Sequence, residues 1–298
     1  MKIDAGTGNA RTMVWAGLSL AVLAAYSPGL IELFRFAYDD DTYSIILGVP
    51  VATAYLLFQR RDEIQARRPG ESVLAGIGCI AAGGLLFLAG RFLGDRLPPL
   101  GSMFLVGISF AATVAGGFGL YAGDRALRRM AFPFLFLLFM APIPPPILDP
   151  IVRFLQRWSA EASDILFRLS GIPVFRDGFV FSLPGITIQV AEECSGIRSS
   201  LALFLLSLVL GHLSLRTGWA KAALAIAVLP ITIVKNAVRI FAITALAVYV
   251  DPTILGSVAH RRGGIPIFLL ALILLGAVLF VLKRLERDPE NTRGSDDR

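Results

Sequence analysis

The chain has 298 residues, of which 55% are apolar and 17% are charged, and its formal net charge is +6. A soluble domain carries about a quarter charged residues, so this composition and the mean hydropathy of +0.70 exclude an ordinary soluble protein. The basic excess indicates no nucleic-acid partner, because lysine and arginine in the cytoplasmic loops of a multi-span membrane protein account for it.

Apolar runs of about twenty residues recur along the chain and predict an all-α polytopic protein in the lipid bilayer. We expect about eight transmembrane helices in a single integral membrane domain over residues 1–298. The first run is long enough to remain as a spanning helix rather than act as a cleavable signal. The expected spans are residues 13–34, 43–58, 72–90, 100–122, 130–148, 197–213, 219–249 and 265–282.

The distribution of basic residues predicts the orientation of these spans, because cytoplasmic loops are enriched in lysine and arginine. One set of alternate loops, 59–71, 123–130 and 214–221, carries four, three and two basic residues. The other set, 35–42, 91–99 and 251–262, carries one, two and two. We therefore expect both termini in the cytoplasm and the segment between the fifth and sixth spans on the outer side.

That outer segment, residues 149–193, is too polar to cross a membrane. Asp149 followed by Pro150 predicts the start of a helix, and Gly171 predicts its end. Apolar residues form one stripe of this helix and charged residues the other face, which predicts an amphipathic helix in the outer interface. The stripe consists of Ile151, Phe154, Leu155, Trp158, Ala162, Ile165, Leu166 and Leu169.

After this helix the sequence changes to short β-favouring runs, with turn signals at Asp177-Gly178 and Pro184-Gly185. These runs predict a small β-meander on the outer surface that leads into Cys194. At the C-terminal end, residues 284–298 are polar and are expected to form a disordered cytoplasmic tail.

Three polar clusters interrupt the apolar background, and ionisable residues within a membrane usually mark a functional site because they are costly there. The sixth and seventh spans form a helical hairpin, so the seventh returns to the side on which the sixth begins. We therefore expect all three clusters to meet near the outer leaflet. The clusters are Glu192, Glu193, Cys194 and Arg198; Lys235, Asn236 and Arg239; and His260, Arg261 and Arg262.

Cys194 lies where strand-like sequence gives way to the sixth span, and Arg198 follows one helical turn later. A helix N-terminus and a nearby cation both favour a thiolate, so this position suits a nucleophile. Glu192 and Glu193 oppose a thiolate unless their side chains point elsewhere or pair with Arg239 or Lys235. The alternative is a small buried thiol at the junction of two elements.

Lys235 and Arg239 are four residues apart on one helix face, where like charges repel each other. They need a carboxylate partner or a bound anion, unless the side chains snorkel to the membrane surface. Asn236 shares this face and could orient Arg239 or make an ordinary interhelical hydrogen bond. His260 could be a general acid or base near neutral pH, or an ordinary loop histidine.

No cofactor is expected from the sequence. The two histidines are predicted on opposite membrane faces, and the two cysteines, Cys79 and Cys194, are far apart, so they cannot form a metal site. Cys79 lies in the middle of the third span among small residues and is predicted to serve in packing.

Three stretches resemble, in order and spacing, the signatures of the exosortase/archaeosortase family, and the polytopic layout is also similar. The resemblance implies a membrane-embedded cysteine protease or transpeptidase whose nucleophile falls on Cys194, whose arginine falls on Arg239 and whose third catalytic residue falls on His260. Arg198 and Lys235 are then candidates for tuning charge or for binding a substrate carboxylate. The stretches are "ECSGIRS" (193–199), "NAVRI" (236–240) and "AHRRGGI" (259–265).

The histidine in the third stretch is similar to that of bacterial exosortases, which implies a bacterial inner-membrane enzyme whose active site faces outward. The implied partner is a membrane-anchored, exported protein with a PEP-CTERM-type sorting signal: a Pro-Glu-Pro-like motif, one transmembrane helix and a basic end. The implied reaction proceeds through a Cys194 thioester that is passed to an acceptor, which the sequence does not identify. A role in exopolysaccharide-linked export or surface display is also implied.

Two other functions remain as alternatives. A transporter or flippase would line a path with polar residues and typically has two related halves, and we find no internal repeat of that kind. A non-catalytic scaffold in polysaccharide export would use the outer β-meander to bind a partner. Fast, pH-dependent alkylation of Cys194 is expected of the enzyme and not of the other two.

Overall fold

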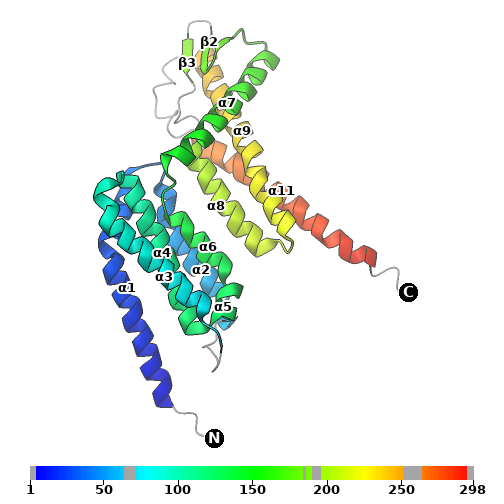
Figure 1. The fold of residues 1–298 in the computed structure, drawn as a ribbon. Coiled ribbons are helices and arrows are strands. Elements are labelled where there is room, and N and C mark those ends of the chain that lie inside the picture. Colours follow the sequence, from blue (N-terminus) through cyan, green and yellow to red (C-terminus); the bar gives the residue numbers. More distant parts are fainter. Residues whose placement is uncertain (1–4, 64–70, 184–185, 190–195, 252–263, 294–298) are drawn as a thin grey trace. The chain divides into compact units, whose positions relative to one another are not determined.

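The structure is a computed structural model, and it describes residues 5–63, 71–183, 186–189, 196–251 and 264–293. The chain divides into two compact units, Met1–Pro144 and Pro145–Arg298. Both units are built from apolar helices, and the described residues form one small sheet (Figure 1). The predicted all-α polytopic membrane architecture is confirmed.

Six helices of the described residues are long and apolar enough to cross a membrane, or seven if Ala131–Met140 and Pro145–Leu169 together count as one broken span. The expected span at 43–58 is a shorter apolar helical segment, Ser44–Gln59. The expected span at 130–148 is interrupted after Met140, because Pro142 and Pro144 have no N–H to donate to a helical hydrogen bond. The six are Met13–Asp39, Leu74–Leu93, Pro99–Ala122, Ile197–Ser214, Gly218–Tyr249 and Gly264–Glu286.

The N-terminal unit is centred on two helices, α3 and α4, whose backbones touch. A Cβ atom at Gly76 would lie 2.9 Å from the carbonyl carbon of Gly119, so only glycine permits this approach. The hydroxyl of Tyr26, on α1, forms a hydrogen bond with the Ser109 hydroxyl on α4. The elements are α1 (Ala5–Asp39), η1 (Ser44–Gly48), α2 (Val49–Gln59), η2 (Arg61–Glu63), α3 (Leu74–Leu93), η3 (Gly94–Arg96), α4 (Pro99–Ala122), α5 (Asp124–Arg129), α6 (Ala131–Leu137) and η4 (Leu138–Met140).

The start of α3 is capped by a residue from elsewhere in the chain. The carboxylate of Asp124, at the start of α5, accepts hydrogen bonds from the N–H groups of Ala75 (3.1 Å) and Gly76 (3.2 Å) and from the Ser72 hydroxyl (2.6 Å). These N–H groups have no partner within the helix, so the buried carboxylate satisfies them. The Ser72 hydroxyl is the main cause that lowers the pKa of Asp124, and the two N–H groups and Arg128 add to this effect against the opposing effect of burial.

Substitution Asp124→Asn is expected to lower the thermal stability of the chain and to flatten its dependence on acid pH. Because the pKa of this carboxyl is lower in the folded chain, its contribution is fully present above the unfolded value of about 3.9 and is lost as the pH falls through the folded value. Thermal unfolding in detergent, measured for both chains between neutral and acid pH, tests this. Equal acid sensitivity of the two chains would contradict the assignment.

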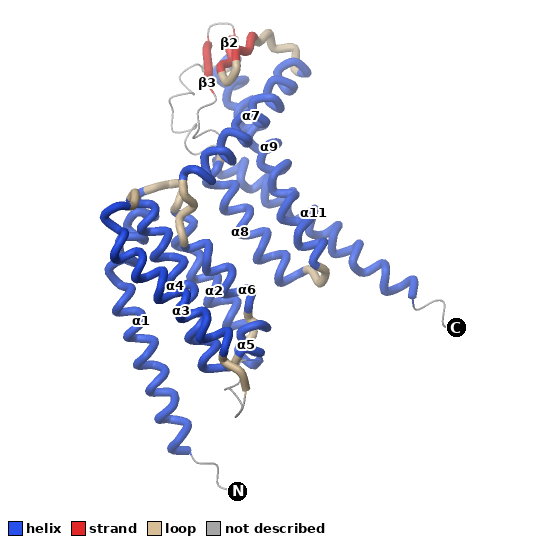
Figure 2. The backbone as a smooth tube through the Cα atoms, in the orientation of Figure 1, coloured by secondary structure: helices blue, strands red, loops and turns tan. Residues whose placement is uncertain are grey.

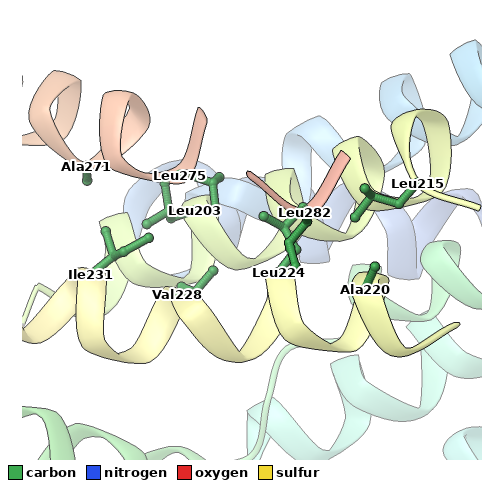
Figure 3. Packing of buried hydrophobic residues seen from close by; sticks show 9 residues of the cluster. All are labelled: Leu203, Leu215, Ala220, Leu224, Val228, Ile231, Ala271, Leu275 and Leu282. Atoms are coloured by element: carbon green, nitrogen blue, oxygen red, sulfur yellow. The ribbon is translucent and has the colours of Figure 1, made fainter. Parts of the chain in front are cut away.

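The C-terminal unit contains a bundle of α8, α9 and α11, in which one face of each helix meets a shared apolar cluster (Figure 3). The cluster consists of Leu203, Leu215, Ala220, Leu224, Val228, Ile231, Ala271, Leu275 and Leu282. The elements of the unit are α7 (Pro145–Leu169), β1 (Phe175–Asp177), β2 (Val180–Leu183), β3 (Ile186–Gln189), α8 (Ile197–Ser214), α9 (Gly218–Tyr249) and α11 (Gly264–Arg293).

Helix α7 begins earlier than predicted and ends as predicted. It starts at Pro145, so the predicted start at Asp149 and Pro150 is wrong. Prolines are tolerated in a first turn, where no helical partner exists for an N–H, and this allows the earlier start. At the other end Gly171 adopts φ 69°, and the N–H of Ile172 bonds to the Phe167 carbonyl at 3.2 Å, which is a Schellman motif.

Helix α7 has a buried side and an exposed side that carries large apolar residues. One side is buried within the C-terminal unit and includes Leu155 of the predicted stripe together with Ser159, Ala160 and Phe167. Most of the predicted stripe stays exposed, as expected of a helix that rests in a membrane interface. The exposed large apolar residues of α7 are Ile147, Ile151, Phe154, Trp158, Ile165 and Leu169.

The predicted β-meander is confirmed: its strands, red in Figure 2, follow the order β1-β2-β3 and pair antiparallel. Asp177 pairs with Val180, so Gly178, with φ 57°, is the first residue of a two-residue hairpin loop. The predicted turn at 184–185 lies outside the described residues. Arg176 forms an ion pair with Glu161 at 3.0 Å and so ties the sheet to α7.

Phe181 lies at the centre of the core between α7, the sheet and α9. It is fully buried, its ring centroid is 5.6 Å from that of Phe167, and the Phe167 centroid is 5.5 Å from that of Phe241 on α9. Ile240, also on α9, belongs to the same cluster. The C-terminal part of α9 is therefore held by the sheet and by α7.

Substitution Phe181→Ala is expected to lower the free energy of unfolding by about 3–5 kcal/mol, the usual cost of emptying a buried aromatic site. Phe175→Ala is the matched control, because Phe175 belongs to the same sheet and is 72% exposed. Denaturant titration of the chain in micelles measures both. An equal effect of the two substitutions would rule out this core.

Helix α11 continues to Arg293, so the polar segment predicted to be a tail from residue 284 begins in helix. The Glu286 carboxylate accepts hydrogen bonds from the N–H groups of Arg216 (3.0 Å) and Thr217 (2.8 Å) and from the Thr217 hydroxyl (2.5 Å). Glu286 therefore caps the start of α9 and closes the turn between α8 and α9.

Candidate functional site

Four of the seven predicted site residues lie within the described part of the chain, all of them in the hairpin of α8 and α9. These are Arg198, Lys235, Asn236 and Arg239, whereas Cys194, Glu193 and His260 lie outside the described residues. The site is therefore built from the four and from what they contact.

The chain enters α8 through a left-handed turn at Gly196, two residues after Cys194. Gly196 has φ 68° and ψ 23°, a conformation that disfavours any residue with a Cβ. Its carbonyl oxygen accepts hydrogen bonds from the hydroxyls of Ser199 (2.9 Å) and Ser200 (2.7 Å) and from the N–H of Ser200 (2.9 Å). These three bonds fix the orientation of the Gly196 carbonyl.

Asn236 fills the space beside Gly196. It is 1% exposed, and a Cβ at Gly196 would lie only 2.4 Å from its Oδ1. Its Nδ2 donates a hydrogen bond at 3.4 Å to the hydroxyl of Ser159, a fully buried residue of α7. This is an interhelical hydrogen bond between α9 and α7. Asn236 thus joins α9 to α7 and to the start of α8.

Lys235, the residue before Asn236, is 2% exposed and donates a hydrogen bond to the Ser199 hydroxyl. The Ser199 proton is directed to the Gly196 carbonyl, so Ser199 accepts from the lysine. Lys235 and Asn236 therefore contact the Gly196 turn from two sides. Lys235 reaches it through Ser199, and Asn236 reaches it directly.

Arg239 is half-buried on the next turn of α9, four residues after Lys235, and so lies about 6 Å further along the helix axis. Because α8 and α9 are joined by a short turn, they run antiparallel, and this displacement points in the direction from which the chain enters α8. Arg198 is exposed, on a different side of α8 from Ser199 and Ser200. The structure therefore separates Arg198 from the buried pair Lys235 and Asn236.

Lys235 and Arg239 were predicted to need an anionic partner. Within the described ranges no carboxylate lies within ion-pair distance of either, and the ion pairs there are Arg61–Asp62, Arg168–Asp164 and Arg176–Glu161. The partner of Lys235 is a hydroxyl. One turn of α9 thus presents a buried ammonium and a half-buried guanidinium beside the start of α8, an arrangement that can stabilise a negative charge.

Sequence reasoning gave no role to three residues of the site: Ser159, and Gly196 and Ser199 within the first signature stretch. The signal for Gly196 is local, because glycine adopts a left-handed conformation more readily than any other residue. Ser159 is small and polar on a helix with an apolar stripe, which hints at an interhelical contact. Nothing in the sequence pairs Ser199 with Lys235, which lies 36 residues away.

A comparison with known families gives one match: the model of the transmembrane exosortase family aligns with residues 37–277. This range spans more than half of the chain and includes all three signature stretches. A search of curated proteins and a search of solved structures both found no match. The chain belongs to the transmembrane exosortase family.

Proposed function

We propose that this exosortase is a cysteine-dependent protease or transpeptidase that cleaves the C-terminal sorting signals of exported proteins. Its substrate is a membrane-anchored protein with a PEP-CTERM-like tail, and its acceptor is water or a nucleophile of the cell envelope. The enzyme resides in the bacterial inner membrane, with both termini in the cytoplasm and the active site facing the periplasm. A substrate cut just outside its own membrane helix presents the scissile bond at that interface.

The observation that supports this proposal most strongly is the contact of Lys235 and Asn236 with the turn at Gly196. Through this contact, the turn of α9 that precedes Arg239 is packed against a position two residues from Cys194. A thiol at a helix start beside cations is the environment that favours a thiolate. The transporter and scaffold alternatives give no reason for this convergence.

The proposed reaction is acyl transfer. The Cys194 thiolate attacks the carbonyl carbon of the scissile peptide bond, and Arg239 stabilises the negative charge that develops on the carbonyl oxygen. The C–N bond then breaks, His260 gives a proton to the leaving amine, and a Cys194 thioester remains. The acceptor attacks the thioester while His260 takes its proton, and cleavage of the C–S bond regenerates the thiolate. Glu193 and Arg198 are proposed to tune the charge of the site.

Co-expression with a candidate tail-bearing protein tests the proposal. Mass spectrometry of the exported product should show a new C-terminus immediately before the membrane helix of the tail, and its mass distinguishes water from another acceptor. An intact tail in the presence of the unchanged exosortase would count against the activity, provided that the same tail is cleaved in the natural host.

A further inference from the structure

The contacts around Gly196 join helices α7, α8 and α9. They hold Gly196 in place, although Gly196 has no side chain and takes no part in the proposed reaction. We define the Gly196 clamp as Ser159, Gly196, Ser199, Lys235 and Asn236. Apart from the half-buried Ser199, the side chains of the clamp are buried, although two of them belong to residue types that are rarely buried in a membrane protein without a function. Apolar packing does not explain why Lys235 and Asn236 are buried here, so the cluster must have another role.

A second nucleophile is one possible reason, because a serine and a buried lysine can form a catalytic pair. In such a pair the serine gives its proton to the lysine. Here the proton of Ser199 is bonded to the Gly196 carbonyl, and the lysine donates to Ser199. These two hydrogen bonds run in one direction, from Lys235 to Ser199 and from Ser199 to the Gly196 carbonyl. This direction is the reverse of the one that a serine nucleophile activated by lysine requires.

The clamp acts on the turn from two independent directions. Asn236 occupies the volume that a Cβ of Gly196 would fill. Lys235 donates a hydrogen bond to Ser199, and Ser199 in turn donates one to the Gly196 carbonyl. Lys235 and Asn236 are adjacent on α9, and Arg239 follows Asn236 by three residues, about 4.5 Å along the axis. One rigid helix therefore carries both the clamp and the arginine.

We propose that Lys235 and Asn236 are positioning residues for the reaction: they hold the Gly196 turn, two residues along the chain from Cys194, in a fixed register with Arg239 on the same helix. This inference rests on the proposed function, since it assumes that Cys194 is the nucleophile. A fixed register matters because a misplacement of about 1 Å at a reacting centre can cost about 10²-fold in rate. Ser159 extends the clamp to α7, so the buried side of the interfacial helix also supports the turn.

The test uses the full chain in dodecyl maltoside micelles with Cys79→Ser, so that Cys194 is the only thiol. The rate of alkylation by iodoacetamide is followed by mass spectrometry across pH, and thermal unfolding is measured in parallel. The described charged groups near the turn are Lys235 and Arg239 on α9 and the exposed Arg198 on α8. Ser199→Ala is expected to leave the unfolding temperature almost unchanged and to raise the midpoint of the alkylation profile by about one pH unit.

A double-mutant cycle tests the direct contact. Gly196→Ala places a methyl group against Asn236 and should slow alkylation more than Asn236→Ala does. The double variant Gly196→Ala/Asn236→Ala removes the clash and keeps only the strain of an alanine at φ 68°, so its rate should be higher than the product of the two single losses. Lys221→Met, on the opposite end of α9, is the matched control for Lys235→Met and should have no effect.

The outcomes separate the two proposals. If Cys194 of the otherwise unchanged chain reacts no faster at neutral pH than a free thiol such as glutathione, both the activated nucleophile and the clamp are overturned. If Cys194 reacts fast and the Ser199, Lys235 and Asn236 variants react equally fast, only the clamp is overturned. Additive losses in the double-mutant cycle would likewise overturn the clamp alone.

Discussion

Substitution Cys194→Ala is expected to reduce cleavage of the sorting-signal tail by at least about 10⁴-fold, the loss typical of removing a nucleophile. The thioester needs a sulfur atom, so no residue of the Gly196 clamp can replace Cys194. The variant should still accumulate in the membrane, because the described contacts that hold the Gly196 turn come from Ser199, Ser200, Lys235 and Asn236, all of which are kept. Immunoblotting of substrate and enzyme together measures both quantities.

The matched control for this experiment is Cys79→Ser. Cys79 lies on α3 against the apolar cluster around Met130 and Phe134, in the other compact unit. Its substitution is expected to leave tail cleavage unchanged. Processing of the substrate by the Cys194→Ala variant at the normal rate would exclude Cys194 as the nucleophile, and the proposed function would have to be abandoned.

Substitution Arg239→Gln is expected to slow tail cleavage by about 10²–10³-fold, the usual effect of losing one group that stabilises an oxyanion. The amide retains hydrogen-bonding capacity and loses the charge, so the loss reports on the charge. Arg239→Lys should rescue only part of the rate, because an ammonium cannot reproduce the planar, forked guanidinium. Initial rates with a tail-bearing substrate in membrane vesicles give these values.

Arg216→Gln is a suitable control for Arg239→Gln. Arg216 lies at the opposite end of the α8–α9 hairpin, where its backbone N–H bonds to Glu286. The substitution keeps that N–H and removes one arginine from the unit. Cleavage by Arg239→Gln at the rate of the unchanged chain, with Arg216→Gln equally active, would show that Arg239 has no catalytic role.

The features predicted correctly from sequence are those that short segments determine by themselves. The apolar run at 219–249 gave α9 almost to the residue, and Asp177-Gly178 gave the first hairpin of the sheet. Gly171 ended α7 because a left-handed residue is needed at that point of the cap. In each of these cases, the residues that determine the element lie in the element itself or within a few residues of its end.

The errors have equally specific causes. Consecutive prolines before Ile147 are compatible with a loop and with a first helical turn, and the chain uses them as a turn, so α7 starts before Asp149. The polar residues of α9 were identified, but their partners were not. Ser199 and Ser159 reach Lys235 and Asn236 from other helices, and only the packing of α7, α8 and α9 brings them together.

The cap that Glu286 provides has a consequence for biogenesis. The α8–α9 hairpin carries the Gly196 clamp at one end and is closed at the other by a carboxylate from α11. Glu286 leaves the ribosome about 70 residues after Thr217, at a synthesis rate of about 5–20 residues per second. The turn between α8 and α9 therefore stays without its closing carboxylate for several seconds after its own synthesis, and the hairpin is closed only once α11 has been made.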